Sequence, residues 1–313
     1  MQIRWGATGI EILAPAKINL FFEVLNRRED GFHEIESLIV PINIYDTLYL
    51  EKAPPGKVSF ATRWIAAPLM PPIAAQHAIP SATDLFGTLP QGEENHAIRA
   101  IRLLAQRAGI VCGAKLHLVK RIPAAAGLGG GSSDAAAALL AANCAWKLNW
   151  SIAQLATIAA EIGSDVPFFL LSRPAICRGR GEIIEPVSGL GTINLVVVRP
   201  PEGLNTAAVY RQCQVGNPPL KVDSMINALR TNRLADFGRL AHNRLLAPAR
   251  TLSKWVDHVL DVLKSENCPV IGMTGSGSSC FAICRSAVHA RHIEARLKSR
   301  RATIGWVQMA ATV

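Results

Sequence analysis

The chain has 313 residues, of which 50% are hydrophobic and only 18% are charged. This composition excludes a disordered or fibrous protein, and the length allows one large domain or two of ordinary size. Lys and Arg number 33 against 23 Asp and Glu, so the net charge is +10. Such a charge favours an anionic partner, without saying whether that is a nucleic acid, a membrane or a phosphorylated metabolite.

Cysteine usage and hydropathy indicate the compartment. The seven cysteines are scattered, and the one close pair, Cys280 and Cys284, has nothing nearby that completes a zinc site. The N-terminal segment is interrupted by Glu11, Pro15 and Lys17, which is not typical of a signal peptide. No segment reaches the roughly 18 apolar residues of a membrane span. We therefore expect a cytoplasmic protein with reduced cysteines and no membrane partner.

The first half of the chain predicts a strand pair followed by mixed elements. Residues 10–25 and 34–51 are rich in Ile, Val, Phe and Leu and flank the turn sequence RREDGFH, which favours two paired strands. Residues 52–93 are rich in Pro and Ala and predict a long surface excursion with at most one short strand, at 57–62. The other elements expected here are a helix at 95–107, a strand at 114–120, an Ala-rich helix that begins at 132–134, and a helix at 151–162 that ends at Gly163 in a left-handed cap.

The second half mixes strands and helices without a regular βαβ alternation. The elements expected are a strand at 193–201, helices between 206 and 264, a strand at 270–273 before a second glycine turn, a basic amphipathic helix at 287–301 and a last strand at 303–313. This pattern favours an α+β fold over a doubly wound sheet. We place a domain boundary near Pro174, so that the predicted domains are 1–174 and 175–313.

The strongest functional signal is the glycine-rich segment PAAAGLGGGSSD at 123–134, between an expected strand and an expected helix. Successive glycines let backbone N–H groups converge on one point, and the N-terminus of a helix adds a partial positive charge. The segment therefore predicts a phosphate-binding loop rather than a flexible linker. It is not a Walker A loop, because no lysine follows the glycines, and not a dinucleotide loop, because Ser132 stands where the third glycine is required. The protein-kinase triplet Asp-Phe-Gly at 236–238 lies in a helical pattern without its companion motifs and is attributed to chance.

Five segments together resemble one family of small-molecule kinases. PAAAGLGGGSSDAAAAL resembles the ATP loop of the kinases named after galactokinase, homoserine kinase, mevalonate kinase and phosphomevalonate kinase, the GHMP kinases. Within them, the order of APAKINLFFEVLNRREDGFHEIESLI, ENHAIRAIRLL, EIGSDVPFFL and TGSGSSCFA is similar to that of the 4-diphosphocytidyl-2-C-methyl-D-erythritol kinase family. The glycine loop alone indicates only the larger family, whereas PAKINL, DGFHEI and GSDVPFF are specific to the smaller one.

The resemblance implies a two-domain α+β fold with the active site in the interdomain cleft. It also implies phosphorylation, by ATP with Mg²⁺, of the 2-hydroxyl of a small molecule that bears a cytidine diphosphate group, in non-mevalonate isoprenoid precursor synthesis. The implied ATP-binding residues are Pro123, Ala124, Ala125, Ala126, Gly127, Leu128, Gly129, Gly130, Gly131, Ser132, Ser133, Asn95, Gly275, Ser276 and Gly277. No metal ligand is assigned with certainty, and Ser132 or Ser133 is the candidate for Mg²⁺.

Two residues are expected to carry the chemistry. Asp165, read alone, suits the N-cap of a short helix. The resemblance instead implies that it is the general base that removes the proton of the acceptor hydroxyl. Lys17 shares a predicted strand face with Asn19 and Phe21 and, read alone, is equally well explained as an exposed lysine. The resemblance pairs Lys17 with Asp165, and Asn19 is expected to help hold the substrate hydroxyl.

Three further residues are expected to bind the substrate base. In the family pattern His33 reads the cytosine through its ring nitrogens, although read alone it is a turn histidine. Phe32 and Tyr210 are expected to stack on the base, and Tyr210 equally suits a place in the core. The family usually has tyrosine where this chain has Phe32, so the ring is kept and its hydroxyl is lost.

Two other functions stay open on the sequence. Another GHMP kinase, acting on homoserine, mevalonate or a sugar, would share the glycine loop but has no need of a base-reading DGFHEI segment. A nucleic-acid-binding protein would fit the net charge and the Arg-rich segment at 285–301, but that segment lacks aromatic residues that stack on bases. We expect no nucleic-acid partner, and either a monomer or a homodimer.

Overall fold

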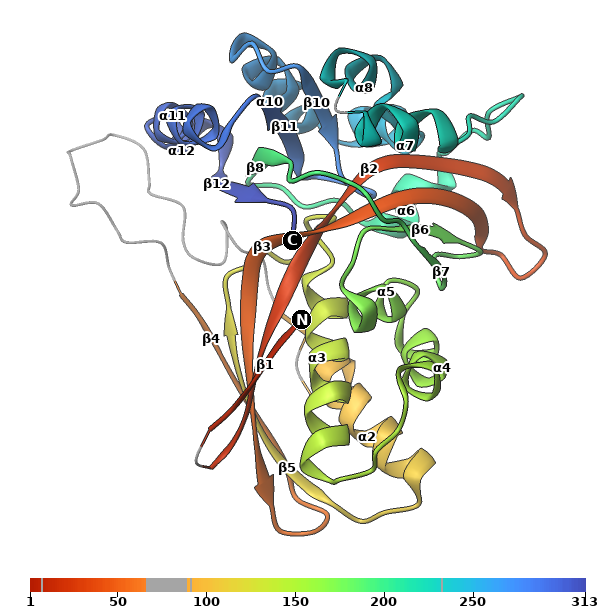
Figure 1. The fold of residues 1–313 in the computed structure, drawn as a ribbon, viewed down its shortest axis with the longest axis vertical. Helices are drawn as coiled ribbons and strands as arrows, with labels where there is room; N and C mark the ends of the chain where they lie inside the picture. Colours follow the sequence, from red (N-terminus) through yellow and green to blue (C-terminus); the bar gives the residue numbers. More distant parts are fainter. Residues whose placement is uncertain (7, 66–88, 91, 232) are drawn as a thin grey trace.

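The computed structural model describes residues 1–6, 8–65, 89–90, 92–231 and 233–313. Within these residues lie an eight-stranded mixed sheet and a four-stranded antiparallel sheet, with helices packed on both (Figure 1). The expected α+β class is therefore confirmed. Most of the excursion predicted at 52–93 lies outside the described residues, but the short strand expected within it is present as β4 (Val58–Trp64).

Two long strands, β2 (Gly9–Arg27) and β3 (His33–Ala53), form the antiparallel pair at the centre of the first sheet (Figure 1). At one end of this pair, β1 joins β2, and β5 joins β3 and has β4 beside it. At the other end, β9 joins β2, and β6 joins β3 and has β7 beside it. Their bounds are β1 (Gln2–Trp5), β5 (Gly113–Lys120), β6 (Ala175–Arg178), β7 (Ile183–Pro186) and β9 (His242–Asn243). The predicted strand pair and the strand at 114–120 are thus confirmed.

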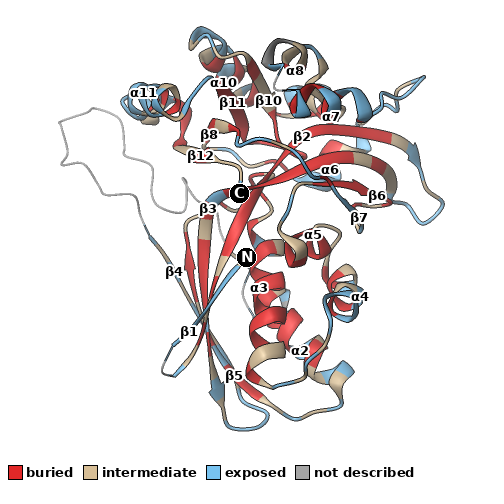
Figure 2. Ribbon diagram, in the orientation of Figure 1, coloured by how far each residue is buried: buried red, intermediate tan, exposed pale blue. Residues whose placement is uncertain are grey.

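An Ala-rich helix, α3, packs against β2 and β3 and is surrounded by other helices. Its run from Ala135 to Ala142 is buried on every side, which is visible in Figure 2. Small side chains let α3 approach the sheet and its neighbours closely, so an almost uniformly apolar helix is fully covered. The helices of this layer are η1 (Gly92–Glu94), α2 (His96–Ala108), α3 (Gly130–Ala145), α4 (Ile152–Ile162) and α5 (Val166–Leu171).

The second sheet has the strand order β10-β11-β8-β12 and is covered on both faces. Leu195 and Val197 of β8 pack toward β2 and β3, whereas Val196 and Val198 pack toward α10 and α11. The uninterrupted apolar run of β8 follows from this double burial. The bounds are β8 (Asn194–Arg199), β10 (Val270–Met273), β11 (Cys280–Cys284), β12 (Trp306–Ala311), α6 (Thr206–Arg211), α7 (Asp223–Arg230), α8 (Leu234–Leu240), α9 (Leu246–Leu252), α10 (Lys254–Ser265), α11 (Ala287–Lys298) and α12 (Arg301–Ile304).

Two predicted helix ends are wrong in detail. The helix α3 begins at Gly130, earlier than predicted, because the left-handed Gly129 (φ 71°) ends the loop and no side chain caps the helix. The helix α4 ends at Gly163 as expected, but the φ of −179° there is extended rather than left-handed. At Gly129 a Cβ would lie 2.7 Å from the ring of Phe169 on α5, so a tertiary contact as well as the φ angle requires glycine there.

The predicted face of Lys17, Asn19 and Phe21 is interrupted. A register shift between Asn19 and Phe21 marks a β-bulge in β2. Phe21 therefore packs in the same apolar cluster as Ile18 and Leu20, while Lys17 and Asn19 remain together on the other side.

All seven cysteines are free, including Cys280 and Cys284 on β11. Among the described residues no group of three or more His, Cys, Asp or Glu could hold a metal ion. Nor does that part of the chain contain a helix long and apolar enough to cross a bilayer. The division into domains at residue 174 stays a prediction.

Glu23 and Glu36 face each other across β2 and β3, where two like charges would destabilise the sheet. Glu23 is fully buried, and Arg244 donates two hydrogen bonds to it, at 2.6 and 2.8 Å. Glu36 accepts a hydrogen bond of 3.0 Å from Arg178. Each carboxylate thus has its own guanidinium, which removes the repulsion between them.

The same carboxylates hold segment 220–222 against the sheet. The N–H of Leu220 donates to Glu23, and the N–H of Val222 donates to Glu36, both at 3.0 Å. Burial alone would raise the pKa of Glu23, but the hydrogen bonds from Arg244 and from backbone N–H groups lower it. Because the ionised form is favoured in the folded state, this stabilisation is present above the unfolded pKa of about 4.3 and is lost as the pH falls through the lower folded pKa.

We predict that Glu23→Ala lowers the free energy of unfolding at pH 7 by about 3–5 kcal/mol, because it leaves buried donors without an acceptor. Urea denaturation measures this change. Asp261→Ala, which breaks the exposed ion pair with Lys264, is the matched control and should change the free energy of unfolding little. Equal losses in the two variants would show that the Glu23 network is no stronger than a surface ion pair.

Candidate active site

The glycine loop connects β5 to α3 and has the conformation of an anion-binding loop. Gly127 and Gly129 have φ angles of 72° and 71°, which glycine adopts without strain. The first hydrogen bond of the helix runs from the N–H of Ser133 to the carbonyl of Gly129, so the N–H groups of residues 130–132 have no acceptor within the helix. Residues 130–132 also line a cavity, which makes this helix N-terminus available to phosphate.

The turn between β10 and β11, residues 274–279, packs directly on the glycine loop. A Cβ atom at Gly127 would lie 2.2 Å from the carbonyl oxygen of Thr274, so only glycine allows this approach. The N–H of Ser279 also donates to the carbonyl of Ala126 at 3.3 Å. This second glycine turn joins the paired strands β10 and β11, and the contact of Gly275, Ser276 and Gly277 with ATP stays a prediction.

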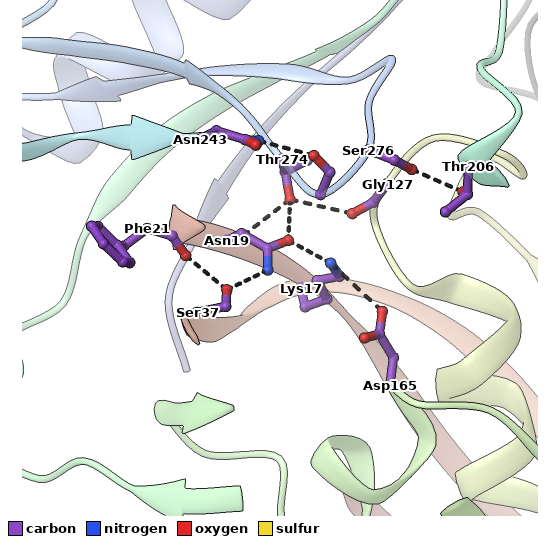
Figure 3. Close-up of polar contacts among 11 residues, drawn as sticks. Lys17, Asn19, Phe21, Ser37, Gly127, Asp165, Thr206, Asn243, Thr274 and Ser276 are labelled. Carbon is purple, nitrogen blue, oxygen red and sulfur yellow. Dashed lines mark hydrogen bonds and ion pairs between the residues drawn. The ribbon is translucent and has the colours of Figure 1, made fainter. Parts of the chain in front are cut away.

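Lys17 and Asp165 come together as an ion pair, with 3.7 Å between Lys17 Nζ and Asp165 Oδ2 (Figure 3). Lys17 is 4% exposed, whereas the Asp165 side chain is 37% exposed. Asp165 stands at the N-cap position of α5, yet its side chain makes no capping hydrogen bond. Since α5 does not use this carboxylate, its two contacts are Lys17 and the cavity.

Asn19 lies beside Lys17 and is hydrogen-bonded to three side chains (Figure 3). Its Oδ1 accepts hydrogen bonds from Lys17 Nζ at 2.5 Å and from the Thr274 hydroxyl at 3.1 Å. Its Nδ2 donates to the hydroxyl of Ser37 at 2.8 Å, and Ser37 in turn donates to the carbonyl of Phe21 at 2.7 Å. These hydrogen bonds fix the orientation of the Lys17 side chain and link β2 to the turn at 274–279.

A cavity of about 1140 Å³ gathers most of the residues that the sequence predicted. Those that line it are Lys17, Asp165, Asn95, Phe32, His33, Tyr210, Pro123, Ala124, Ala125, Ala126, Gly127, Gly129, Gly130, Gly131, Ser132, Gly275, Ser276 and Gly277. Leu128, Ser133 and Asn19 are not on its wall, and all three are buried behind it. The cavity thus joins the loop, the ion pair and the aromatic residues in one space.

Aromatic rings occupy one part of the cavity wall. The rings of His33 and Tyr210 are 5.0 Å apart and tilted by 33°, and Tyr210 meets Phe22 edge-on at 6.5 Å. Phe32 is 49% exposed, and the guanidinium of Arg180 lies 4.7 Å from its ring centroid. Burial, with a smaller effect of a nearby arginine, lowers the pKa of His33, so its ring is neutral at pH 7 and offers one donor and one acceptor.

Asn95, one of the residues expected to bind ATP, is the N-cap of α2. Its side chain accepts a hydrogen bond from the N–H of Ala97 at 3.0 Å and donates to the carbonyl of Pro90 at 3.2 Å. Because Asn95 also lies on the cavity wall, the cap is compatible with the predicted contact to adenine, which stays a prediction.

The sequence did not single out several charged residues that line the same cavity. Lys120 and Asp134 flank the glycine loop and form an ion pair of 2.7 Å. Arg27, Arg180 and Arg211 lie on the wall as well. The pair of Lys120 and Asp134 could have been predicted, because a lysine and an aspartate stand at the two ends of the loop in the sequence. The three arginines are distant from each other in the sequence and gave none.

Comparison with known proteins places this site in a family. The profile "GHMP kinases N terminal domain" matches residues 95–173, which contain the glycine loop and Asp165, and "GHMP kinases C terminal" matches residues 225–302. A 4-diphosphocytidyl-2-C-methyl-D-erythritol kinase of Pelotomaculum thermopropionicum is 36% identical over 92% of this chain and 94% of its own length. The chain belongs to the 4-diphosphocytidyl-2-C-methyl-D-erythritol kinase family. It is therefore an ATP-dependent small-molecule kinase.

Other relatives agree with this assignment. A protein of the same name from Rhodopirellula baltica is 34% identical over 95% of this chain and 92% of its own length. The crystal structure of a 4-(cytidine 5'-diphospho)-2C-methyl-D-erythritol kinase superposes with a TM-score of 0.75 at 33% identity, over 96% of this chain and 98% of that one. A homoserine kinase from Cytophaga hutchinsonii superposes with a TM-score of 0.69 at 17% identity, over 100% of this chain and 97% of that one, and shows only that the fold is shared.

We predict that Gly127→Ala raises the Kd for ATP at least tenfold, because the added methyl group collides with the backbone of the 274–279 turn. Isothermal titration calorimetry measures the affinity. Gly191→Ala is the control, since Gly191 is not on the cavity wall and a Cβ there meets no atom within 4 Å. If both variants bind ATP as well as the wild type, the contact between turn and loop has no part in nucleotide binding.

Proposed function

We propose that this kinase transfers the γ-phosphoryl group of ATP to the 2-hydroxyl of 4-diphosphocytidyl-2-C-methyl-D-erythritol, giving the 2-phosphate and ADP in isoprenoid precursor synthesis. The observation that carries the proposal is the Lys17–Asp165 pair, which opens into the same cavity as the glycine loop and the aromatic residues. Phosphoryl transfer depends mainly on positioning and on charge stabilisation, and this cavity has groups for both. The names of the relatives supply the substrate.

In this mechanism Asp165 is the general base. Its carboxylate is exposed to the cavity and not used by α5, so it accepts the proton of the acceptor hydroxyl as the new P–O bond forms. Lys17 stabilises the carboxylate and the developing negative charge on the acceptor oxygen. Asn19 is buried and is not on the cavity wall, so its role is to hold Lys17 in place through the hydrogen bond to Nζ.

The glycine loop and the N-terminus of α3 bind the phosphates of ATP, and Asn95 lies near the adenine. Mg²⁺ fits this site, because Ser133 has a buried hydroxyl oxygen without a hydrogen-bond partner at the start of α3, and Ser132 lies on the cavity wall. Oxygen atoms are the ligands that Mg²⁺ prefers. When bound, the ion would neutralise part of the phosphate charge.

The aromatic residues select the base. Neutral His33 pairs a donor and an acceptor with the polar edge of cytosine, and its ring is held by Tyr210. Phe32 supplies a stacking surface that needs no hydroxyl. A kinase for homoserine or mevalonate has no base to read, which is why the alternative GHMP substrates are disfavoured.

The partners follow from this chemistry. We propose a substrate with a cytidine diphosphate group, no nucleic-acid partner, and a monomer or homodimer. Seven free cysteines are compatible with a reducing compartment, and we place the enzyme in the cytoplasm.

The proposed substrate predicts a narrow acceptor range. In a coupled ADP-release assay with Mg-ATP, we expect turnover with 4-diphosphocytidyl-2-C-methyl-D-erythritol and none with homoserine, mevalonate or galactose. The reason is that the last three leave the base-binding residues empty and the acceptor hydroxyl unpositioned. Turnover with homoserine or mevalonate instead would reject the proposed substrate while leaving the kinase assignment intact.

The proposed base predicts a large effect on kcat. Asp165→Asn should lower kcat by about 10²–10⁴-fold while both KM values stay within a few-fold, since a general base contributes by that order. The melting temperature should stay near that of the wild type, because the carboxylate does not cap α5. Steady-state kinetics and thermal denaturation measure these quantities.

Two further variants control this experiment. Lys17→Met should cost a similar factor, and the double variant should lose much less than the product of the two, because the residues act as a unit. Asp261→Asn, at an exposed ion pair with Lys264, should leave kcat unchanged. An Asp165→Asn enzyme with most of its kcat would mean that the proton leaves by another route.

A further inference from the structure

The loop that joins β6 to β7, residues 179–182, packs between β3 and the segment that carries Asp165. On one side, the N–H of Ile35 on β3 donates to the first carbonyl group of the loop at 2.9 Å. On the other side, a Cβ atom at Gly181 would lie 3.6 Å from the side chain of Ser164, the residue directly before Asp165. The loop therefore lies between the strand next to the aromatic residues and the proposed catalytic carboxylate.

Arg180 is the residue of this loop that lines the cavity, together with Phe32 and Asp165. Its guanidinium lies over the Phe32 ring, 4.7 Å from the ring centroid, and its side chain is 30% exposed. A planar guanidinium that stacks on a ring keeps its N–H groups at its edge, where they can still bind an anion. The contact with Phe32 therefore holds Arg180 in position without using its donors.

Within the part of the chain that the structure describes, no acceptor takes a hydrogen bond from the guanidinium of Arg180. Glu182 Oε1 lies 3.9 Å from Arg180 Nε, which is too long for a hydrogen bond. The Glu182 carboxylate instead accepts from the backbone N–H of Arg180 at 2.6 Å. Asp30, on the turn that carries Phe32, accepts hydrogen bonds from Arg28 and from the N–H of Phe32. The donors of Arg180 are thus available to a ligand in the cavity.

The other lysines and arginines of the cavity wall are less suited to bind a phosphate group of the substrate. Lys17 and Lys120 are both paired with carboxylates. Arg27 and Arg211 are exposed, so water and salt screen the charge that they offer. Arg180 is less exposed than these two arginines, and a charge that is partly shielded from water attracts an anion more strongly.

We propose that Arg180 binds the diphosphate group of the substrate and makes the site selective for a nucleoside diphosphate over the nucleoside alone. This inference rests on the proposed function, which places the base at Phe32 and His33 and the acceptor hydroxyl at Asp165. The diphosphate joins the cytidine to the part of the substrate that is phosphorylated, so it has to pass between these residues. A guanidinium can hold phosphate oxygens with two parallel N–H···O hydrogen bonds, and its charge offsets that of the diphosphate.

The inference predicts that Arg180 matters more for cytidine diphosphate than for cytidine. Titration calorimetry measures the Kd of each probe with ADP at saturating concentration, so that the glycine loop is already filled. The wild type should bind cytidine diphosphate more tightly than cytidine. Arg180→Gln should raise the Kd of cytidine diphosphate by about 10–100-fold, the effect of losing hydrogen bonds to a charged group. The Kd of cytidine should rise by at most about fivefold, the effect of losing the cation–π contact that holds Phe32.

Two further variants control this experiment. Arg180→Lys keeps the charge but loses the planar pair of donors, so its Kd for cytidine diphosphate should lie between those of the wild type and Arg180→Gln. Arg291→Gln removes an exposed positive charge on α11, away from the cavity wall, and should leave both Kd values unchanged. In steady-state kinetics, Arg180→Gln should raise the KM for the proposed substrate and leave the KM for ATP unchanged. Thermal denaturation shows that each variant is folded.

The outcomes are distinct. If the wild type binds neither cytidine nor cytidine diphosphate, the proposed function fails. If Arg180→Gln weakens both probes by the same factor, Arg180 acts only through the Phe32 ring, and this inference alone is overturned. Equal affinity of the wild type for the two probes, or an equal loss in Arg291→Gln, overturns it as well. Should Arg180→Gln fail to fold, the ratio of the two Kd values in Arg180→Lys decides the matter, and an unchanged ratio rejects the inference.

Discussion

The antiparallel ladder between β2 and β3 holds the two halves of this kinase together. At one end it carries β1, β5 and the layer of α2 to α5, and at the other it carries β6, β9 and the contact with the second sheet. Lys17 and Asn19 lie between these ends, immediately before the bulge that turns Phe21 into the apolar cluster. Because the register is fixed on both sides, the backbone of Lys17 cannot slide along the ladder without displacing one of two cores, and Asn19 and Asp165 then hold its ammonium group.

Three carboxylates near this ladder differ in their hydrogen-bond partners and in their exposure, and these differences match their roles. Glu23 is fully buried and accepts hydrogen bonds from Arg244 and from two backbone groups, so it acts as a rigid tie between segments. Asp165 has one charged partner and an exposed side, which leaves it accessible to a substrate. Asp134 is buried and shares the ammonium group of Lys120 with Asp46, so it ties the start of α3 to the sheet.

The sequence predicted those parts of the site that depend on local backbone chemistry. The run of glycines before an Ala-rich helix predicted a phosphate-binding loop. The strand pair, α2 and the turn at 274–279 were predicted from hydrophobic periodicity and from turn residues. The sequence could not predict that Asp46 lies beside Lys120, because β3 and β5 are neighbours in the sheet but these two residues are 74 positions apart in the sequence. The bulge after Asn19 and the extended φ at Gly163 also escaped, since tertiary packing sets both. Resemblance supplied the pairing of Lys17 with Asp165, which no local pattern contains.

The contacts of Phe32 account for a phenylalanine at a position where the family pattern has tyrosine. The N–H of Phe32 donates to Asp30 at 3.1 Å and its carbonyl accepts from Arg28 at 2.9 Å, so the backbone of the turn is fixed without help from the ring. The guanidinium of Arg180 lies over one face of the ring at 4.7 Å, which holds the ring by a cation–π contact. A hydroxyl is not needed to orient a ring that is held in this way. Since Arg180 lies over one face of the ring, the proposed stacking of a base on Phe32 has to use the opposite face.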